Sequence, residues 1–139
     1  MAPYVYRPLK DKGQEIRLMT LMPGTISCEI RIELETILLK GNDAKPQYEA
    51  LSYAWGPAES LVDIRVGDSE ASLGVTQNLA TALAYLRHED QPRHLWIDAV
   101  CVNQHDLRER SEQVLCMGDV YRMAARVVVW LGPEDQSSN

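Results

Sequence analysis

Two helical patterns alternate with two apolar strand patterns between residues 76 and 131, and this order constrains the fold more than any other feature. Thr76 is a good N-cap for a helix whose leucines, Leu79, Leu83 and Leu86, recur at helical spacing. Residues 94–100, HLWIDAV, then predict a strand buried on both faces. A second helix follows, and an apolar strand begins at Arg126. Helices between successive strands imply right-handed crossovers and a parallel sheet, so the expected fold class is α/β.

The second helix is expected to begin at Asp106. Glu109 lies three residues later, as in a capping box. Gly118 predicts close packing of this helix against the sheet. The expected apolar face consists of Val114, Met117, Val120, Tyr121 and Ala124.

The first half of the chain, residues 15–75, is β-rich. A strand from Glu15 ends at a Pro-Gly turn, and the next run, ISCEIRIELETILL, alternates apolar and charged residues from Cys28 to Glu35. Two short strands around Gly67-Asp68 predict a hairpin. We therefore expect an antiparallel, β-rich N-terminal addition to the parallel sheet. The whole chain, 1–139, is expected to form one domain, with 76–133 as its alternating part and 134–139 as a frayed tail.

Charge and composition exclude several classes of protein. The 139 residues carry a net charge of −6 with scattered basic residues, which argues against a nucleic-acid partner. No run of about 18 uncharged apolar residues exists, so no membrane span is expected, and the N-terminus lacks a secretory pattern. The three cysteines, Cys28, Cys101 and Cys116, lack paired spacing. We expect reduced thiols, no metal site and a cytoplasmic protein.

Three blocks resemble the fungal heterokaryon incompatibility (HET) domain: IRLMTLMPG, YEALSYAWG and the long run from LWIDAVCVNQ to VVVWLG. The resemblance covers nearly all of residues 4–133. Val100 and Val102 stand where isoleucines are common in such sequences. The family is associated with programmed cell death when genetically unlike fungal cells fuse. The resemblance therefore implies a signalling module that associates with itself or with protein partners.

The same resemblance implies a fold similar to the Toll/interleukin-1 receptor (TIR) domain, a flavodoxin-like unit. SYAWG, LWIDAV and VVVWLG would be its first three core strands. Because some TIR domains cleave NAD, NAD is a candidate substrate, with no firmly bound cofactor expected. The family continues past WLG to a helix carrying a glutamate similar to the catalytic glutamate of those TIR domains. This chain ends at Asn139, so it is expected to be a truncated domain that lacks activity by itself.

With that glutamate absent, Asp98 and Glu109 are the candidate catalytic carboxylates. A carboxylate near the ribose would stabilise the oxocarbenium-like transition state of NAD cleavage. Asp98 lies where a parallel strand ends, the usual place for ligands in open α/β sheets. Its alternative role, which we favour, is capping or accepting loop N–H bonds from Val100 to Asn103. Glu109 could complete the helix cap or pair with Arg110.

Six further residues are candidate ligand contacts. Asn103 and Gln104 can both donate and accept hydrogen bonds, which suits a ribose, an amide or simply a turn. Ser52, Tyr53, Trp55 and Gly56 lie where the first core strand ends, and Trp55 could stack on a ring or fill the core.

A thiol protease built on Cys101 and His105 is not supported, because the two are close in sequence and no orienting third group is evident.

Overall fold

The structure is a computed structural model that describes residues 2–10, 15–25, 29–39, 47–53, 61–67 and 71–130. The predictions for Cys28, Trp55, Gly56, the Gly67-Asp68 turn beyond Gly67 and the tail 134–139 lie outside these ranges.

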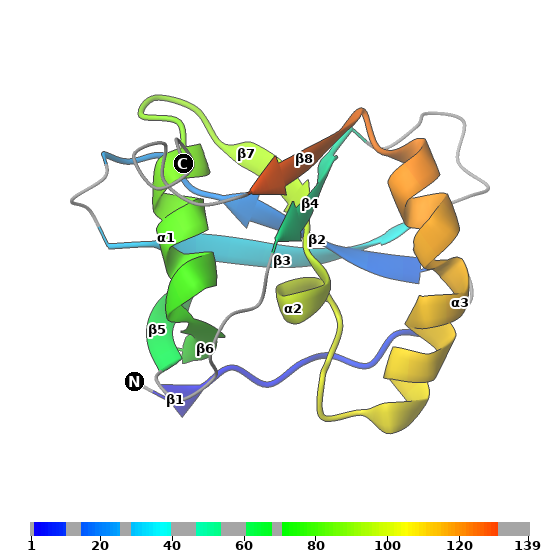
Figure 1. Cartoon of the computed structure of the whole chain (residues 1–139). Helices are drawn as coiled ribbons and strands as arrows, with labels where there is room; N and C mark the ends of the chain where they lie inside the picture. Colours follow the sequence, from blue (N-terminus) through cyan, green and yellow to red (C-terminus); the bar gives the residue numbers. More distant parts are fainter. Residues whose placement is uncertain are drawn as a thin grey trace.

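Within the described ranges, eight strands form one mixed sheet in the order β1-β6-β5-β3-β2-β7-β4-β8 (Figure 1). The strands are β1 (Ala2–Pro3), β2 (Glu15–Leu21), β3 (Arg31–Leu38), β4 (Glu49–Tyr53), β5 (Leu61–Val66), β6 (Ala71–Thr76), β7 (Arg93–Trp96) and β8 (Arg126–Trp130). The helices are α1 (Gln77–Leu86), the short α2 (Asp98–Cys101) and α3 (Leu107–Met123).

The predicted α/β class and its parallel strands are confirmed. β4 is the central strand of the parallel part and pairs with β7 on one side and β8 on the other. The chain passes from β4 through β5, β6 and α1 to β7, and then through α2 and α3 to β8 on the opposite side of β4. The two connections, β4 to β7 and β7 to β8, therefore run in opposite directions across the sheet.

The N-terminal addition is largely antiparallel, as expected, but it also contains parallel pairs. β2 pairs antiparallel with both β3 and β7, so the N-terminal strands continue the same sheet. β3 and β5 are parallel neighbours, while β5 and β6 form the expected antiparallel pair. Alternation of apolar and polar residues along a strand does not identify the neighbouring strand, because a sheet with one solvent-exposed face is compatible with parallel or antiparallel pairing.

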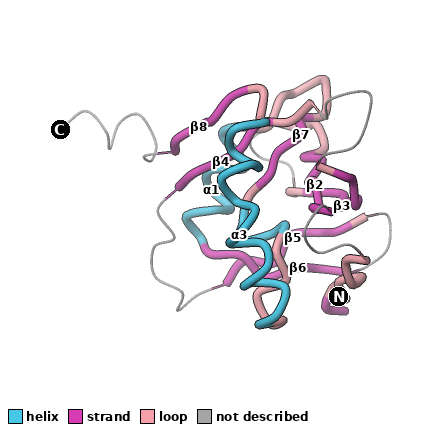
Figure 2. The backbone as a smooth tube through the Cα atoms, turned by 90° about the vertical axis from the view of Figure 1, so that its right-hand side faces the viewer, coloured by secondary structure: helices cyan, strands magenta, loops and turns pink. Residues whose placement is uncertain are grey.

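α1 and α3 cover opposite faces of the β8-β4-β7 part of the sheet (Figures 1 and 2). The Trp96 ring of β7 packs edge-on against Tyr121 of α3, with centroids 5.8 Å apart. On the other face, the Trp130 ring of β8 contacts the Tyr85 ring of α1, with ring centroids 5.6 Å apart. Consecutive crossovers in opposite directions produce this three-layer arrangement when both are right-handed.

Both helices begin as predicted. The Thr76 hydroxyl accepts a hydrogen bond from the Leu79 N–H at 3.2 Å, and the Asp106 carboxylate accepts from the Glu109 N–H at 3.1 Å. These caps satisfy backbone donors that lack partners inside each helix.

Three local predictions are wrong. The strand expected over 94–100 ends at Trp96, and Asp98 begins the turn of α2. On the expected apolar face, Val120 is buried and Met117, Tyr121 and Ala124 pack against the core, but Val114 is 60% exposed. The other buried side chains of α3 are those of Glu109, Gln113 and Cys116. A Cβ added at Gly118 would meet nothing within 4 Å, so this glycine does not permit a close approach. The helix turns polar side chains inward because Glu109 has a buried partner, Arg17.

Candidate functional site

The candidate site lies at the carboxyl ends of β4 and β7. Tyr53 ends β4, and Asp98 follows Ile97 directly after β7. Burial raises the pKa of Tyr53 to about 12, and the charge of Asp98 contributes to this rise. Ser52 is exposed, and because side chains alternate along a strand it points to the face opposite Tyr53. Tyr53 therefore lies within reach of the charge of Asp98, but neither Tyr53 nor Ser52 is among the residues that line the cavity at Asp98.

Asp98 is half-buried at a cavity of about 360 Å³. Burial raises the pKa of its carboxyl group above the ordinary value, and hydrogen bonds from backbone N–H groups oppose that rise. Burial also raises the pKa of Tyr121, with Asp98 as the second cause. Besides Asp98, the cavity is lined by Val102, Gln104, Arg110, Val114 and Met117. A carboxyl group beside apolar walls and one guanidinium can bind a hydroxyl-bearing polar ligand.

Asn103 and Gln104 both stabilise the turn between α2 and α3. The Gln104 side-chain amide donates to the carbonyls of Asp98, at 2.7 Å, and Val102, at 3.3 Å. The Asn103 side-chain oxygen accepts from the His105 N–H at 3.2 Å. Gln104 also lines the cavity, so it can contact a ligand there while it holds the turn.

Glu109 is committed to a buried ion pair with Arg17. The guanidinium donates two hydrogen bonds to this carboxylate, at 2.6 and 2.8 Å, and the two side chains are 1% and 3% exposed. Burial alone would lower the pKa of Arg17, but the hydrogen bonds and charge of Glu109 outweigh it and raise that pKa. The predicted side-chain roles for Glu109, in the helix cap or with Arg110, are replaced by this pair. Only its backbone N–H joins the cap.

The Arg17–Glu109 pair also holds the segment that carries Asp98. Arg17 donates to the Cys101 carbonyl at 3.1 Å, and Glu109 accepts from the Asn103 N–H at 2.6 Å. The Tyr6 hydroxyl donates to the Val100 carbonyl at 2.6 Å. Residues 98–103 are therefore fixed by side chains from the N-terminal arm, β2 and α3.

Sequence reasoning missed Arg17. The available signal was a single charge inside the run IRLMTL, which is buried at nearly every position of β2. A buried arginine needs a carboxylate partner, and that requirement would have directed attention to Glu109.

Another missed cluster fixes the opposite end of the parallel strands. Glu49 binds Arg93 through two hydrogen bonds, at 2.6 and 3.2 Å, and also pairs with Arg126 at 3.2 Å. The hydrogen bond from Arg93 lowers the pKa of Glu49. Each residue precedes or begins an apolar run, a position from which charges can meet where parallel strands start.

Cys101 is unsuited to nucleophilic catalysis. It is fully buried, and burial raises the pKa of its thiol to about 12. Its sulfur accepts from the Ile97 N–H at 3.5 Å. Because the thiolate is the reactive form, a thiol in this environment is inert.

The described ranges contain no group of three or more His, Cys, Asp or Glu residues arranged to hold a metal ion. None of the helices described is both long enough and apolar enough to cross a membrane.

Comparison with known proteins identifies relatives in fungi. The family model for heterokaryon incompatibility protein (HET) matches residues 48–139. Heterokaryon incompatibility protein 6, OR allele, of Neurospora crassa is 38% identical over 142 aligned residues, which cover 94% of this chain and 21% of that protein. Vegetative incompatibility protein HET-E-1 of Podospora anserina is 32% identical over 89 residues, covering 62% of this chain and 6% of that protein. No solved structure matches. The chain thus spans about a fifth or less of these relatives, 21% and 6%.

Proposed function

The chain belongs to the heterokaryon incompatibility (HET) family, and from this premise we propose that it is an incompatibility-signalling module that acts through protein association in the cytoplasm. The observation that carries the proposal is the 38% identity to a heterokaryon incompatibility protein over 94% of the chain. Association is the proposed mechanism, because NAD cleavage would have only one of the two candidate carboxylates at its disposal. Glu109 is buried in its pair with Arg17, which leaves Asp98.

β8 supports association. It is an edge strand of the described sheet, so its outer backbone groups can pair with another chain. Val127 is 49% exposed and Val129 is 61% exposed. The strand register places both on the face that bears Trp96, toward α3. An apolar edge strand of this kind is a typical binding surface for a second polypeptide.

Expression in a fungal host tests the biological role. The parent chain and a Val5→Asp variant, which changes an 81% exposed valine on the N-terminal arm, should both arrest growth. Val129→Asp places a charge on the β8 edge and should restore growth at equal protein level. Normal growth with the parent chain, or arrest by all three proteins, would reject association through β8 as the mechanism.

A second candidate function is NAD hydrolysis, and the strand order favours it. β4 lies between β7 and β8, so the crevice at its carboxyl end is a topological switch point, as in flavodoxin-like and TIR-like sheets. Asp98 and its cavity lie at this end. In this proposal the Asp98 carboxyl group accepts a hydrogen bond from a ribose hydroxyl of NAD and stabilises positive charge that develops on the sugar.

NAD binding can be measured separately from turnover by following backbone amide resonances. We expect saturable shifts around the cavity, with Asp98→Asn weakening binding about tenfold and the exposed Asp63→Asn on β5 leaving it unchanged. NAD consumption is then assayed on the same samples. Absence of saturable shifts, or equal binding by Asp98→Asn, would eliminate this candidate and leave the association proposal untouched.

A further inference from the structure

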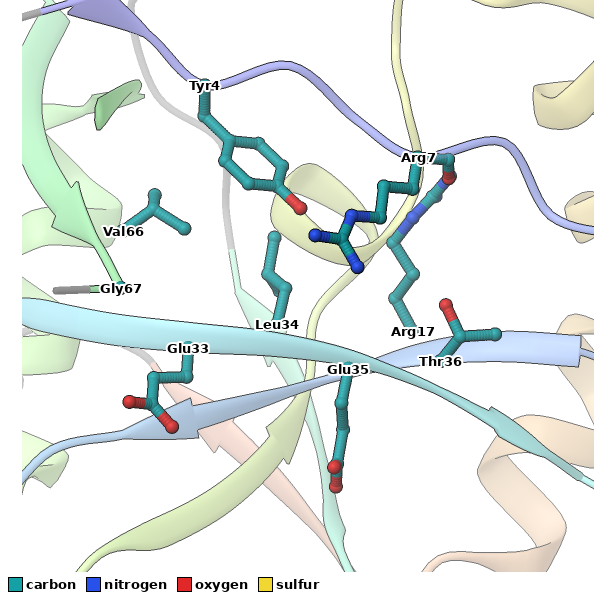
Figure 3. Close-up of a pocket in the computed structure, with 9 residues that line it drawn as sticks. All are labelled: Tyr4, Arg7, Arg17, Glu33, Leu34, Glu35, Thr36, Val66 and Gly67. Carbon is teal, nitrogen blue, oxygen red and sulfur yellow. The ribbon is translucent and has the colours of Figure 1, made fainter. Parts of the chain in front are cut away.

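A second pocket, separate from the Asp98 cavity, lies between the N-terminal arm and strands β3 and β5 (Figure 3). Its volume is about 500 Å³, within the range of about 300–1,000 Å³ usual for small-molecule sites. The residues that line it are Tyr4, Arg7, Arg17, Glu33, Leu34, Glu35, Thr36, Val66 and Gly67. Neither the family comparison nor the proposed function assigns this pocket a role.

The N-terminal arm, which forms one side of the pocket, is held by hydrogen bonds that do not involve the Tyr4 hydroxyl or the Arg7 guanidinium. The Tyr4 N–H donates to the Ser72 carbonyl at 2.7 Å, and Arg17 donates to the Arg7 carbonyl at 2.8 Å. Between them, Tyr6 is fixed through its hydroxyl bond to Val100. Because the backbone of the arm is anchored at both ends and in the middle, Tyr4 and Arg7 are presented in a fixed relation.

The Arg7 guanidinium and the Tyr4 hydroxyl point toward one another over the pocket (Figure 3). Neither group has a hydrogen bond or ion pair to any residue that the structure describes. A guanidinium offers a planar fork of donors that matches a carboxylate or phosphate, and the phenol adds another donor. The two groups form the polar half of a site for an oxyanion.

The opposite side of the pocket is mainly apolar, with Thr36 as a polar residue at its border. Leu34 and Val66 project toward the arm, whereas Glu33 and Glu35 lie on the other side of β3 (Figure 3). This separation follows from the alternation of side chains along a strand. Arg17 also borders the pocket, but its charge is matched by Glu109. The unmatched charge facing the interior is therefore that of Arg7.

We propose that this pocket binds a small organic anion, whose carboxylate or phosphate faces Arg7 and Tyr4 and whose apolar body lies against Leu34 and Val66. Ligand recognition here is independent of β8 and of Asp98, so the site can add small-molecule control to a module that works elsewhere on its surface.

Amide resonances of the full chain, titrated with four probes, test this assignment. The probes are benzoate, phenyl phosphate, inorganic phosphate and benzyl alcohol. Benzoate or phenyl phosphate should give saturable shifts at residues 4–7, 34 and 66, and the other two should bind more weakly because each lacks one half of the ligand. Arg7→Gln should weaken binding of the aromatic anion about tenfold or more, and Tyr4→Phe by a smaller factor.

Arg108→Gln is the matched control, since Arg108 is an exposed arginine in α3 that lies outside the pocket. It should bind like the parent chain. Arg7→Gln retains the backbone carbonyl that Arg17 binds, and an unchanged spectrum away from the pocket shows that it folds. Absence of saturable shifts from both aromatic anions, or equal binding by Arg7→Gln, would overturn the assignment. Equal binding of benzyl alcohol would overturn the oxyanion half, and equal binding of inorganic phosphate the apolar half.

Discussion

Replacing Glu109 with glutamine should destabilise the fold by about 3 kcal/mol, because it leaves the buried Arg17 cation without a matching charge. Both side chains are at most 3% exposed, so water cannot compensate for the lost carboxylate. The bonds from Arg17 to the carbonyls of Cys101 and Arg7 remain, which places the cost at the lower end of the range for broken buried pairs.

Urea unfolding at neutral pH measures this cost. With a slope of about 1.5 kcal/mol per M, the Glu109→Gln midpoint should fall by about 2 M at unchanged slope. The control is Glu112→Gln, which changes a half-buried glutamate in the same helix. It should change the free energy of unfolding by less than about 0.5 kcal/mol. If the midpoint of Glu109→Gln lay as close to that of the parent as the midpoint of Glu112→Gln does, the reasoning would be refuted.

A double variant, Arg17→Met with Glu109→Leu, separates charge from packing. Apolar side chains of similar volume remove both buried charges together, so the double variant should cost less than the sum of its two single changes. Additive costs would mean that the pair contributes through packing alone.

Three further predictions use the same unfolding measurement. Burial raises the pKa of Asp98 in the folded state above 3.8. Its contribution to stability is therefore present below pH 3.8 and is lost as the pH rises through the folded-state pKa. Asp98→Asn should be more stable than the parent at neutral pH, and the two proteins should be equally stable below pH 3.8. Glu49 has a lowered pKa, so its contribution is present above pH 4.5 and lost as pH falls; Glu49→Gln should cost about 1–2 kcal/mol at neutral pH and converge with the parent in acid. Thr76→Ala removes the acceptor for the Leu79 N–H and should cost about 1 kcal/mol, with a matching loss of helical circular dichroism at elevated temperature.

The sequence predicted the elements well where a local signal determined them. Thr76 and Asp106 cap their helices because the signal for a helix start lies within three residues of the cap. Trp96 and Ile97 are fully buried, as the apolar run HLWIDAV predicted. The run nevertheless overstated the strand, because Asp98 and Val100 adopt the helical turn that Arg17 and Tyr6 hold from distant segments.

Sheet topology was the part that local pattern could not reveal. The pairing of β2 with β7 joins residues more than 70 positions apart, as in Met19 with Leu95, and no periodicity encodes that neighbour. The polar side chains that α3 turns inward were missed for the same reason. Glu109 and Gln113 are inward because Arg17 and the Glu15 carbonyl lie opposite them, and a helical pattern that counts only apolar residues omits such partners.

Near the candidate site, Tyr53 and Asp98 both lie at the carboxyl ends of parallel strands, which share one edge of the sheet, and their role in ligand binding stays a prediction. Asn103 and Gln104 hold the turn, one of the two roles that the sequence left open.

Sedimentation velocity over a range of concentrations tests association through β8 most directly. The parent chain and Val5→Asp should form species larger than a monomer as concentration rises, and Val129→Asp should remain monomeric. A parent chain that stays monomeric throughout, or a Val129→Asp variant that associates as strongly as Val5→Asp, would contradict the proposal that this edge strand is the binding surface.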